Sequence, residues 1–121
     1  MDDVLRVVCL CAQWCGVCRD YAVPFEQAAA EFGTRCEFAW VDIEDEADLL
    51  DRVDVENFPT LLLARGDRVL FFGTITPHAQ TLARLVQGAL AGDLRPLPAN
   101  PTIDSLARRC ALARLSPRGR P

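Results

Sequence analysis

The 121-residue chain contains no lysine, a single histidine and no apolar run long enough to cross a membrane. All thirteen cationic side chains are arginine, which we interpret as a composition bias without functional weight. A membrane-spanning helix needs about 20 apolar residues, and the longest uninterrupted runs, such as 7–12 and 61–64, are far shorter. The N-terminus also lacks the basic region and the cleavage site of an export signal. We therefore expect a cytoplasmic protein.

Positive charge is scarce over most of the chain and concentrated near its C-terminal end. Residues 1–91 carry 7 arginines against 15 acidic residues, whereas residues 92–121 carry 6 arginines against 2 acidic residues. Phosphate contacts need a basic face, so the acidic body disfavours nucleic acid as the main partner. The basic tail keeps nucleic acid or a membrane surface open as a minor alternative, although such charge runs are usually solvated. We expect a monomer with neither partner.

The composition is 50% hydrophobic and 25% charged, which is enough apolar material for one core without disulfide staples. Six cysteines are present. Because the chain shows no export signal and has a sufficient core, we expect reduced thiols that serve catalysis, metal binding or burial.

The hydrophobic pattern predicts one α/β domain over residues 1–91. The nearly continuous apolar run at 4–11 is typical of a central strand that is covered on both faces. Three helices and three more strands are predicted after it. The helices are at residues 16–33, 45–53 and 76–91, and the strands are at residues 36–42, 60–64 and 68–72. The order β-α-β-α-β-β-α predicts a three-layer sandwich around a mixed four-stranded sheet, because a helix joins the first two strands and a tight turn joins the last two.

Residues 92–121 are predicted to be a basic C-terminal tail rich in proline and arginine. "GDLRPLPANP" is typical of a linker, and "TIDSLARRCALARL" (102–115) can form one short helix. Because the tail follows the last helix of the predicted domain, we expect deletion of residues 93–121 to cost little stability. The alternative is an integral helix packed over a sheet edge, whose removal would lower the melting temperature strongly.

Cys15 and Cys18 fall where the first strand passes into the first helix. Cys15 would be the N-cap residue, and the free N–H groups and partial positive charge of a helix N-terminus stabilise a thiolate there. We expect Cys15 to be the exposed nucleophile and Cys18, about one turn deeper, to be the resolving thiol. The N–H of Val17 is expected to point at the Cys15 sulfur.

"WCGVC" at 14–18, "NFPTLLL" at 57–63 and "FFG" at 71–73 together resemble the thioredoxin superfamily, over residues 4–91. The resemblance implies a thioredoxin-like fold and a thiol–disulfide oxidoreductase that reduces protein disulfides. It implies a redox-active disulfide between Cys15 and Cys18, with no other cofactor and no metal. It also implies a reductase or another thiol protein as the electron donor.

The resemblance further assigns substrate-binding roles to four residues. Trp14 would flank the redox pair, and Gly73 would belong to the substrate groove. The Phe58-Pro59 bond would be cis and would leave the preceding backbone free to pair with a substrate strand. For Trp14, a simple cap of the core is the alternative.

The chain departs from the familiar thioredoxin pattern in ways that affect the mechanism. Familiar thioredoxins begin with an additional strand and helix, whereas the central strand here starts at residue 4. Their buried aspartate is matched by Cys9, which the resemblance places near Cys18, and its lysine partner is matched by Trp40. Cys9 and Cys11 share one face of the strand, and we favour small buried hydrophobes over a second relay pair.

Two other function classes stay open. A thioredoxin-like binding or scaffold module would dock a partner with marginal redox turnover, and an insulin-reduction assay would separate it from the enzyme. The other class is a metal site, in which four thiolates would bind zinc or an iron–sulfur cluster. Its ligands would be Cys9, Cys11, Cys15 and Cys18, but their spacing departs from the usual pair of CxxC knuckles.

Overall fold

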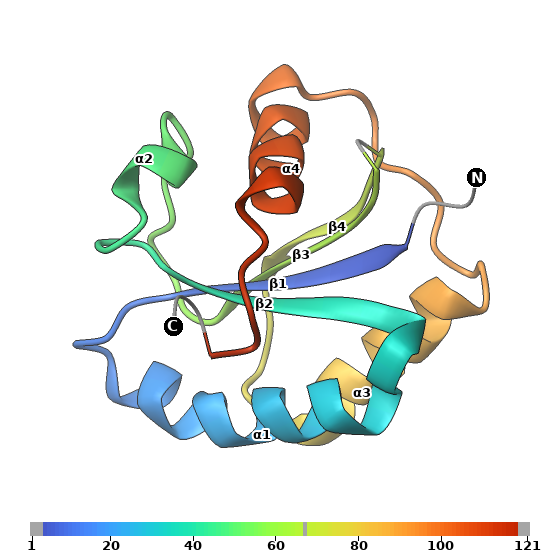
Figure 1. Ribbon diagram of the computed structural model, residues 1–121, viewed down its shortest axis with the longest axis horizontal. Coiled ribbons are helices and arrows are strands. Elements are labelled where there is room, and N and C mark those ends of the chain that lie inside the picture. Colours follow the sequence, from blue (N-terminus) through green and yellow to red (C-terminus); the bar gives the residue numbers. More distant parts are fainter. Residues whose placement is uncertain (1–3, 67, 119–121) are drawn as a thin grey trace.

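The computed structural model describes residues 4–66 and 68–118, and a mixed four-stranded sheet lies at its centre (Figure 1). The strand order is β2 (Cys36–Asp42), β1 (Leu5–Cys11), β3 (Thr60–Arg65) and β4 (Arg68–Thr74). β1 pairs in parallel with β2 and antiparallel with β3, and β3 pairs antiparallel with β4. The central position of the first strand and the mixed sheet are confirmed. The turn between β3 and β4 includes residue 67, which lies outside the described residues.

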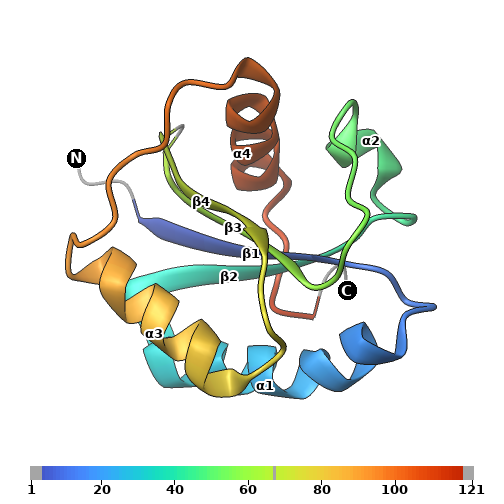
Figure 2. The same ribbon diagram turned by 180° about the vertical axis from the view of Figure 1, so that it is seen from behind.

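Helices α1 (Gly16–Phe32) and α3 (Ala79–Leu90) cover one face of the sheet (Figures 1 and 2). The helical spacing in the sequence buries one stripe of α1, and the short helix η1 (Gly33–Arg35) follows it; the buried residues of α1 are Cys18, Tyr21, Phe25, Ala28 and Phe32. Gly33 takes a positive φ of 61°, which glycine adopts without a steric cost. α3 begins three residues later than predicted, with His78 as its N-cap.

Helices α2 (Ala47–Leu50) and α4 (Pro101–Ala113) cover the opposite face (Figures 1 and 2). α2 is shorter than the predicted 45–53 helix. The start of α4 is well defined, because the Asn100 side chain accepts hydrogen bonds from the N–H groups of Thr102 (3.1 Å) and Ile103 (3.3 Å). Leu106, Ala107 and Cys110 of α4 are buried in one cluster with Val8 and Leu10 of β1.

The C-terminal segment is therefore an integral part of the core, which corrects the expectation of a dispensable tail. Arg109 donates to the carbonyl oxygens of Leu49 (2.7 Å) and Leu50 (3.3 Å), which ties α4 to α2. After α4, the Ser116 carbonyl accepts from the N–H of Trp40 (2.9 Å) on β2. The segment thus covers one face of the sheet and part of the outer edge of β2. No helix within the described ranges is long and apolar enough to cross a membrane.

Candidate active site

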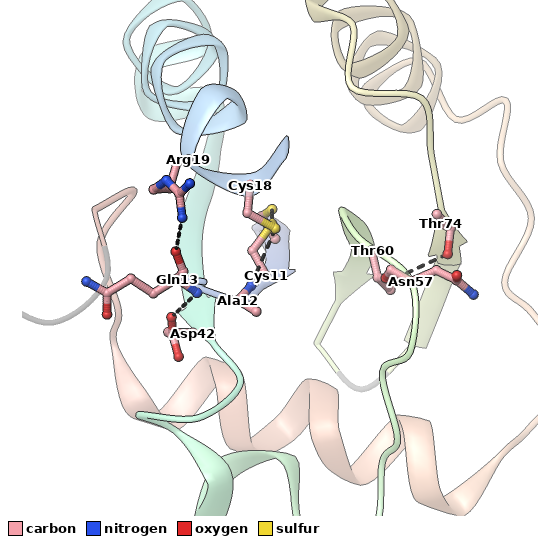
Figure 3. The surroundings of a disulfide bond; sticks show 10 residues. Cys11, Ala12, Gln13, Cys18, Arg19, Asp42, Asn57, Thr60 and Thr74 are labelled. Atoms are coloured by element: carbon pink, nitrogen blue, oxygen red, sulfur yellow. Dashed lines mark hydrogen bonds between the residues drawn. A yellow bond between two sulfur atoms is a disulfide. The ribbon is translucent and has the colours of Figure 1, made fainter. Parts of the chain in front are cut away.

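The loop between β1 and α1 is held in place by hydrogen bonds from several elements (Figure 3). The N–H of Gln13 donates to Asp42 Oδ2 at the end of β2 (2.9 Å), and Arg19 of α1 donates to the Gln13 carbonyl (2.9 Å). The N–H of Cys15 donates to the Ala12 carbonyl (3.0 Å). These contacts fix where the first cysteine of the motif lies relative to the helix.

Cys15 is the N-cap residue of α1, as predicted from the sequence. Its backbone is extended (φ −89°, ψ 122°), its thiol is free, and its side chain is partly exposed beside the buried cluster under α1. Its side chain accepts no capping hydrogen bond. The expected bond from the Val17 N–H to the Cys15 sulfur is therefore absent here, although the sulfur still lies at the positive end of a 17-residue helix.

Cys18 is disulfide-bonded to Cys11 and not to Cys15 (Figure 3). The two Cα atoms are 5.7 Å apart, within the usual range for a disulfide. Cys11 is the last residue of β1 and is 0% exposed, and Cys18 lies in the first turn of α1 and is 1% exposed. The N–H of Ala12 donates to the Cys18 sulfur (3.4 Å). The pairing in the structure thus differs from the Cys15–Cys18 disulfide that the resemblance implied.

The missed partner, Cys11, carried a signal in the sequence. Alternate residues of a strand point to the same face, and β1 directs Leu5, Val7, Cys9 and Cys11 toward α1. The sequence pattern favours simple burial for both Cys9 and Cys11. The structure supports burial for Cys9, whereas Cys11 has a covalent partner.

Cys9 contacts the Cys11 sulfur, which is 3.7 Å from the Cys9 sulfur. Burial raises the pKa of the Cys9 thiol far above its ordinary range, so this group stays protonated at neutral pH. Burial is also the main cause that raises the pKa of Tyr21, and the negative charge of an ionised Cys9 at high pH is the second cause. Trp40 lies opposite Cys9 in the β1–β2 register.

The expected substrate-binding residues lie on the loop before α1, directly before β3 and near the end of β4. The Trp14 ring packs edge-on against Phe58, with ring centroids 5.5 Å apart, yet Trp14 is 63% exposed and does not cap the core. The Phe58-Pro59 bond is cis, and the Pro59 carbonyl accepts from the N–H of Ile75 (3.1 Å). Gly73 lies opposite Leu61 in the hairpin. The structure thus brings Trp14 and Phe58 into contact, whereas Pro59 lies directly before β3 and Gly73 lies near the end of the neighbouring strand β4.

A cavity of about 590 Å³ lies beside Cys18 and is lined by α1, by acidic residues that follow β2, and by Pro117 and Arg118 from the C-terminal segment. Arg118 closes one side of it, because its guanidinium pairs with Glu26 of α1. Within the described residues, no three histidine, cysteine, aspartate or glutamate side chains are grouped so that they could hold a metal ion.

Solved structures of thioredoxins share this arrangement of strands and helices. The thioredoxin of Trypanosoma brucei brucei superposes with a TM-score of 0.64 at 28% sequence identity, covering 74% of this chain and 78% of that one. The germline-specific thioredoxin Deadhead of Drosophila melanogaster gives a TM-score of 0.63 at 22% identity, covering 70% of this chain and 80% of that one, which supports the fold.

Sequence comparison leads to the same group. Thioredoxin-1 of Drosophila yakuba is 30% identical over 89 residues, which cover 71% of this chain and 83% of that protein. A protein disulfide-isomerase of Arthroderma benhamiae is 43% identical over 56 residues, but the match spans only 11% of that longer protein. The family model described as Thioredoxin matches residues 2–87. Since that match covers well over half of the sequence, the chain belongs to the thioredoxin family.

Proposed function

We propose that this chain is a cytoplasmic thiol–disulfide oxidoreductase that reduces protein disulfides, with Cys15 as the attacking thiol and Cys18 as the resolving thiol. The observation that carries the proposal is the position of Cys15, a free, partly exposed thiol at the N-terminus of α1. Cys18 lies one helical turn further on and is buried. An accessible thiol at a helix N-terminus, with a protected second cysteine one turn away, is the arrangement that disulfide exchange needs.

The reduced chain would act in two exchange steps. The Cys15 thiolate attacks one sulfur of the substrate disulfide, which forms a mixed disulfide and releases one substrate thiolate. The Cys18 thiolate then attacks the Cys15 sulfur, which forms an intramolecular disulfide and releases the second substrate thiolate. Two electrons pass from the two cysteines to the substrate, and a reductase or another thiol protein would return them.

The exposed Trp14–Phe58 contact and the loop that carries Pro59 would receive the substrate strand beside Cys15. Trp14 offers a large apolar surface that is available to a partner, since 63% of the residue is exposed. Gly73 would leave room for the substrate backbone at the hairpin. We propose that the chain works as a monomer in this reaction.

One observation favours a second candidate function, a thioredoxin-like scaffold with marginal turnover. Cys18 is engaged with Cys11 in the structure, so Cys15 has no free resolving thiol in this state. If the Cys11–Cys18 bond resists reduction, the chain would bind partners through Trp14 and Phe58 without completing the exchange.

An insulin-reduction assay with dithiothreitol as the electron donor separates these candidates. We expect the wild-type chain to accelerate insulin precipitation, and Cys15→Ser to fall to the rate that dithiothreitol gives alone, because the serine hydroxyl does not attack disulfides. Cys36→Ala is the matched control, since Cys36 is a buried free cysteine at the opposite end of the sheet. Equal rates for the wild type and Cys15→Ser would exclude the enzyme and favour the scaffold.

A further inference from the structure

Cys18 lies between two other cysteines that play different roles in the structure. It follows Cys15 by three residues in the first turn of α1, and it is bonded to Cys11 at the end of β1. Cys15 is partly exposed, whereas both sulfur atoms of the Cys11–Cys18 bond belong to buried residues. Cys18 is therefore bonded to a buried cysteine and lies three residues along the chain from a partly exposed thiol.

We propose that Cys11 is a third exchange thiol and that Cys18 passes its disulfide bond from Cys15 to Cys11, so that the oxidised site stores its disulfide in the core and returns Cys15 to the free form. This proposal rests on the proposed function and names a further residue for the same reaction. The oxidised product is then the Cys11–Cys18 state seen in Figure 3.

The added step is a thiol–disulfide exchange within the chain. The Cys11 thiolate attacks the Cys18 sulfur of the Cys15–Cys18 disulfide; the Cys11–Cys18 bond forms, the Cys15–Cys18 bond breaks, and Cys15 leaves as a thiolate. Cys11 loses a proton when it attacks, and the Cys15 thiolate takes one up. One disulfide bond replaces another, so the step needs no external oxidant or reductant. Over all three steps, the substrate disulfide gains the two electrons that Cys11 and Cys18 lose.

The environments of Cys15 and Cys11 determine the direction of the exchange within the chain. Cys15 is partly exposed and lies at the positive end of α1, whereas an unbonded Cys11 would be a fully buried thiol beneath the helix. A leaving thiolate that its surroundings stabilise departs faster, which favours loss of Cys15 from Cys18. The transfer therefore runs toward the buried bond.

Two contacts assist the same step. The Cys9 thiol, which burial keeps protonated, lies 3.7 Å from the Cys11 sulfur and can donate to it while that sulfur carries charge. The N–H of Ala12 donates to Cys18 (3.4 Å) and holds the sulfur that is attacked. Cys9 is then a positioning residue for Cys11 and takes no part in a disulfide.

The relay has a consequence for the exposed thiol. With the Cys11–Cys18 bond in place, Cys15 can attack a second disulfide, but the resulting mixed disulfide cannot be resolved until Cys18 is free. The oxidised chain would hold such a partner covalently, whereas the reduced chain would release it. The redox state of a buried bond thereby controls how long the surface thiol retains its partner.

Disulfide mapping of the full chain tests the relay, with glutathione disulfide as the oxidant. The reduced protein is mixed with one equivalent, quenched with acid at successive times, alkylated, and cleaved after Leu10 and Trp14 with chymotrypsin and after Arg19 with trypsin. A Cys11–Cys18 bond links peptide 11–14 to peptide 15–19, whereas a Cys15–Cys18 bond lies within peptide 15–19. We expect the Cys15–Cys18 species first and the Cys11–Cys18 species, with alkylated Cys15, as the final product.

Two variants separate a relay from a purely structural disulfide. In Cys11→Ala, alkylation of Cys15 after oxidation should fall at least about tenfold, because Cys18 then keeps Cys15 as its partner. In Cys15→Ser, formation of the Cys11–Cys18 bond should slow by at least about tenfold, because an exposed thiolate carries the oxidising equivalent to the buried pair. Cys36→Ala should behave as the wild type.

The relay is overturned if wild-type protein ends with only the Cys15–Cys18 bond, or if Cys15→Ser forms the Cys11–Cys18 bond at the wild-type rate. Neither result depends on insulin reduction. An active insulin reductase that ends as Cys15–Cys18 would retain the proposed function without the relay. An inactive chain whose wild-type time course shows the transfer would retain the relay without that function.

Discussion

The two faces of the sheet share the strand β1 but contain different chemistry. On the α1 and α3 face, β1 contributes Cys9 and Cys11, and five of the six cysteines lie in or against that cluster. On the α2 and α4 face, β1 contributes Val8 and Leu10, and the cluster holds a single cysteine, Cys110. The alternation of side chains along one strand therefore separates a cysteine-rich face, which contains the Cys11–Cys18 disulfide, from a face with a single cysteine.

The two faces also differ in the sequence separation between β1 and the helices that pack against it. The α1 helix follows β1 after a loop of four residues and is aligned by it directly. The α4 helix follows α3 after a connection of ten residues, and it packs back against strands that lie far earlier in the sequence. If the second face is as important for stability as the first, substitutions in α4 should lower the free energy of unfolding as much as substitutions on the α1 and α3 face.

Deletion of residues 97–121 should have the largest effect on stability. It removes α4 and uncovers Val8 and Leu10, and burial of a leucine such as Leu106 alone contributes about 1.5–3 kcal/mol. A loss of several kcal/mol is a large part of the roughly 5–15 kcal/mol that stabilises a domain. We expect the melting temperature, followed by circular dichroism, to fall by more than about 10 °C. A fall of only a degree or two would show that the α1 and α3 face is stable alone.

Point substitutions give a finer comparison of the two faces. Leu106 on α4 and Leu82 on α3 are both 0% exposed, so replacement of either by alanine should lower the free energy of unfolding by about 2–5 kcal/mol. Leu112→Ala is the matched control, because Leu112 lies on the same helix as Leu106 but is 81% exposed. It should change stability by less than about 0.5 kcal/mol in urea denaturation. A Leu106→Ala cost as small as the Leu112→Ala cost would make α4 a peripheral helix.

The difference between the faces explains what the sequence could predict of the fold. Strong local signals identified β1, the amphipathic stripe of α1 and the β3–β4 hairpin, because each depends on residues close together in the chain. The helix in the C-terminal segment was also predicted, but its packing was not. Its apolar residues, such as Leu106 and Cys110, are spaced among arginines, and only the long-range contact with β1 shows that they are buried.

The same reasoning applies to the candidate site. Cys15 was predicted at the N-cap because a local pattern, strand followed by helix, determines that position. The disulfide partner of Cys18 was not predicted, because the choice between Cys15 and Cys11 depends on how α1 lies across the end of β1. Sequence spacing favours the cysteine three residues away, whereas the packing places Cys11 at the end of β1 within bonding distance of Cys18.

The smallest predicted effect concerns the lone cysteine of the α2 and α4 face. Burial raises the pKa of the Cys110 thiol to about 11, although the nearby guanidinium groups of Arg109 and Arg6 act in the opposite direction. In the unfolded chain the thiol ionises near its ordinary pKa of about 8.5. The protonated folded form therefore contributes its full stability below about pH 8.5, and this contribution is lost as the pH rises toward 11. Between pH 8 and pH 10 the loss should be about 1–2 kcal/mol.

Urea denaturation of the wild type and of Cys110→Ala at both pH values, with a phosphine reductant to keep the thiols free, measures this loss. The chain has no lysine, so few other groups titrate in this range. Cys9 and Tyr21, whose pKa values burial also raises, are present in both proteins, so their contributions cancel in the comparison. The wild type should lose about 1–2 kcal/mol more than the variant over this interval. Parallel losses in the two proteins would mean that Cys110 meets water in the folded state, and that α4 covers its face of the sheet less completely than α1 covers the other.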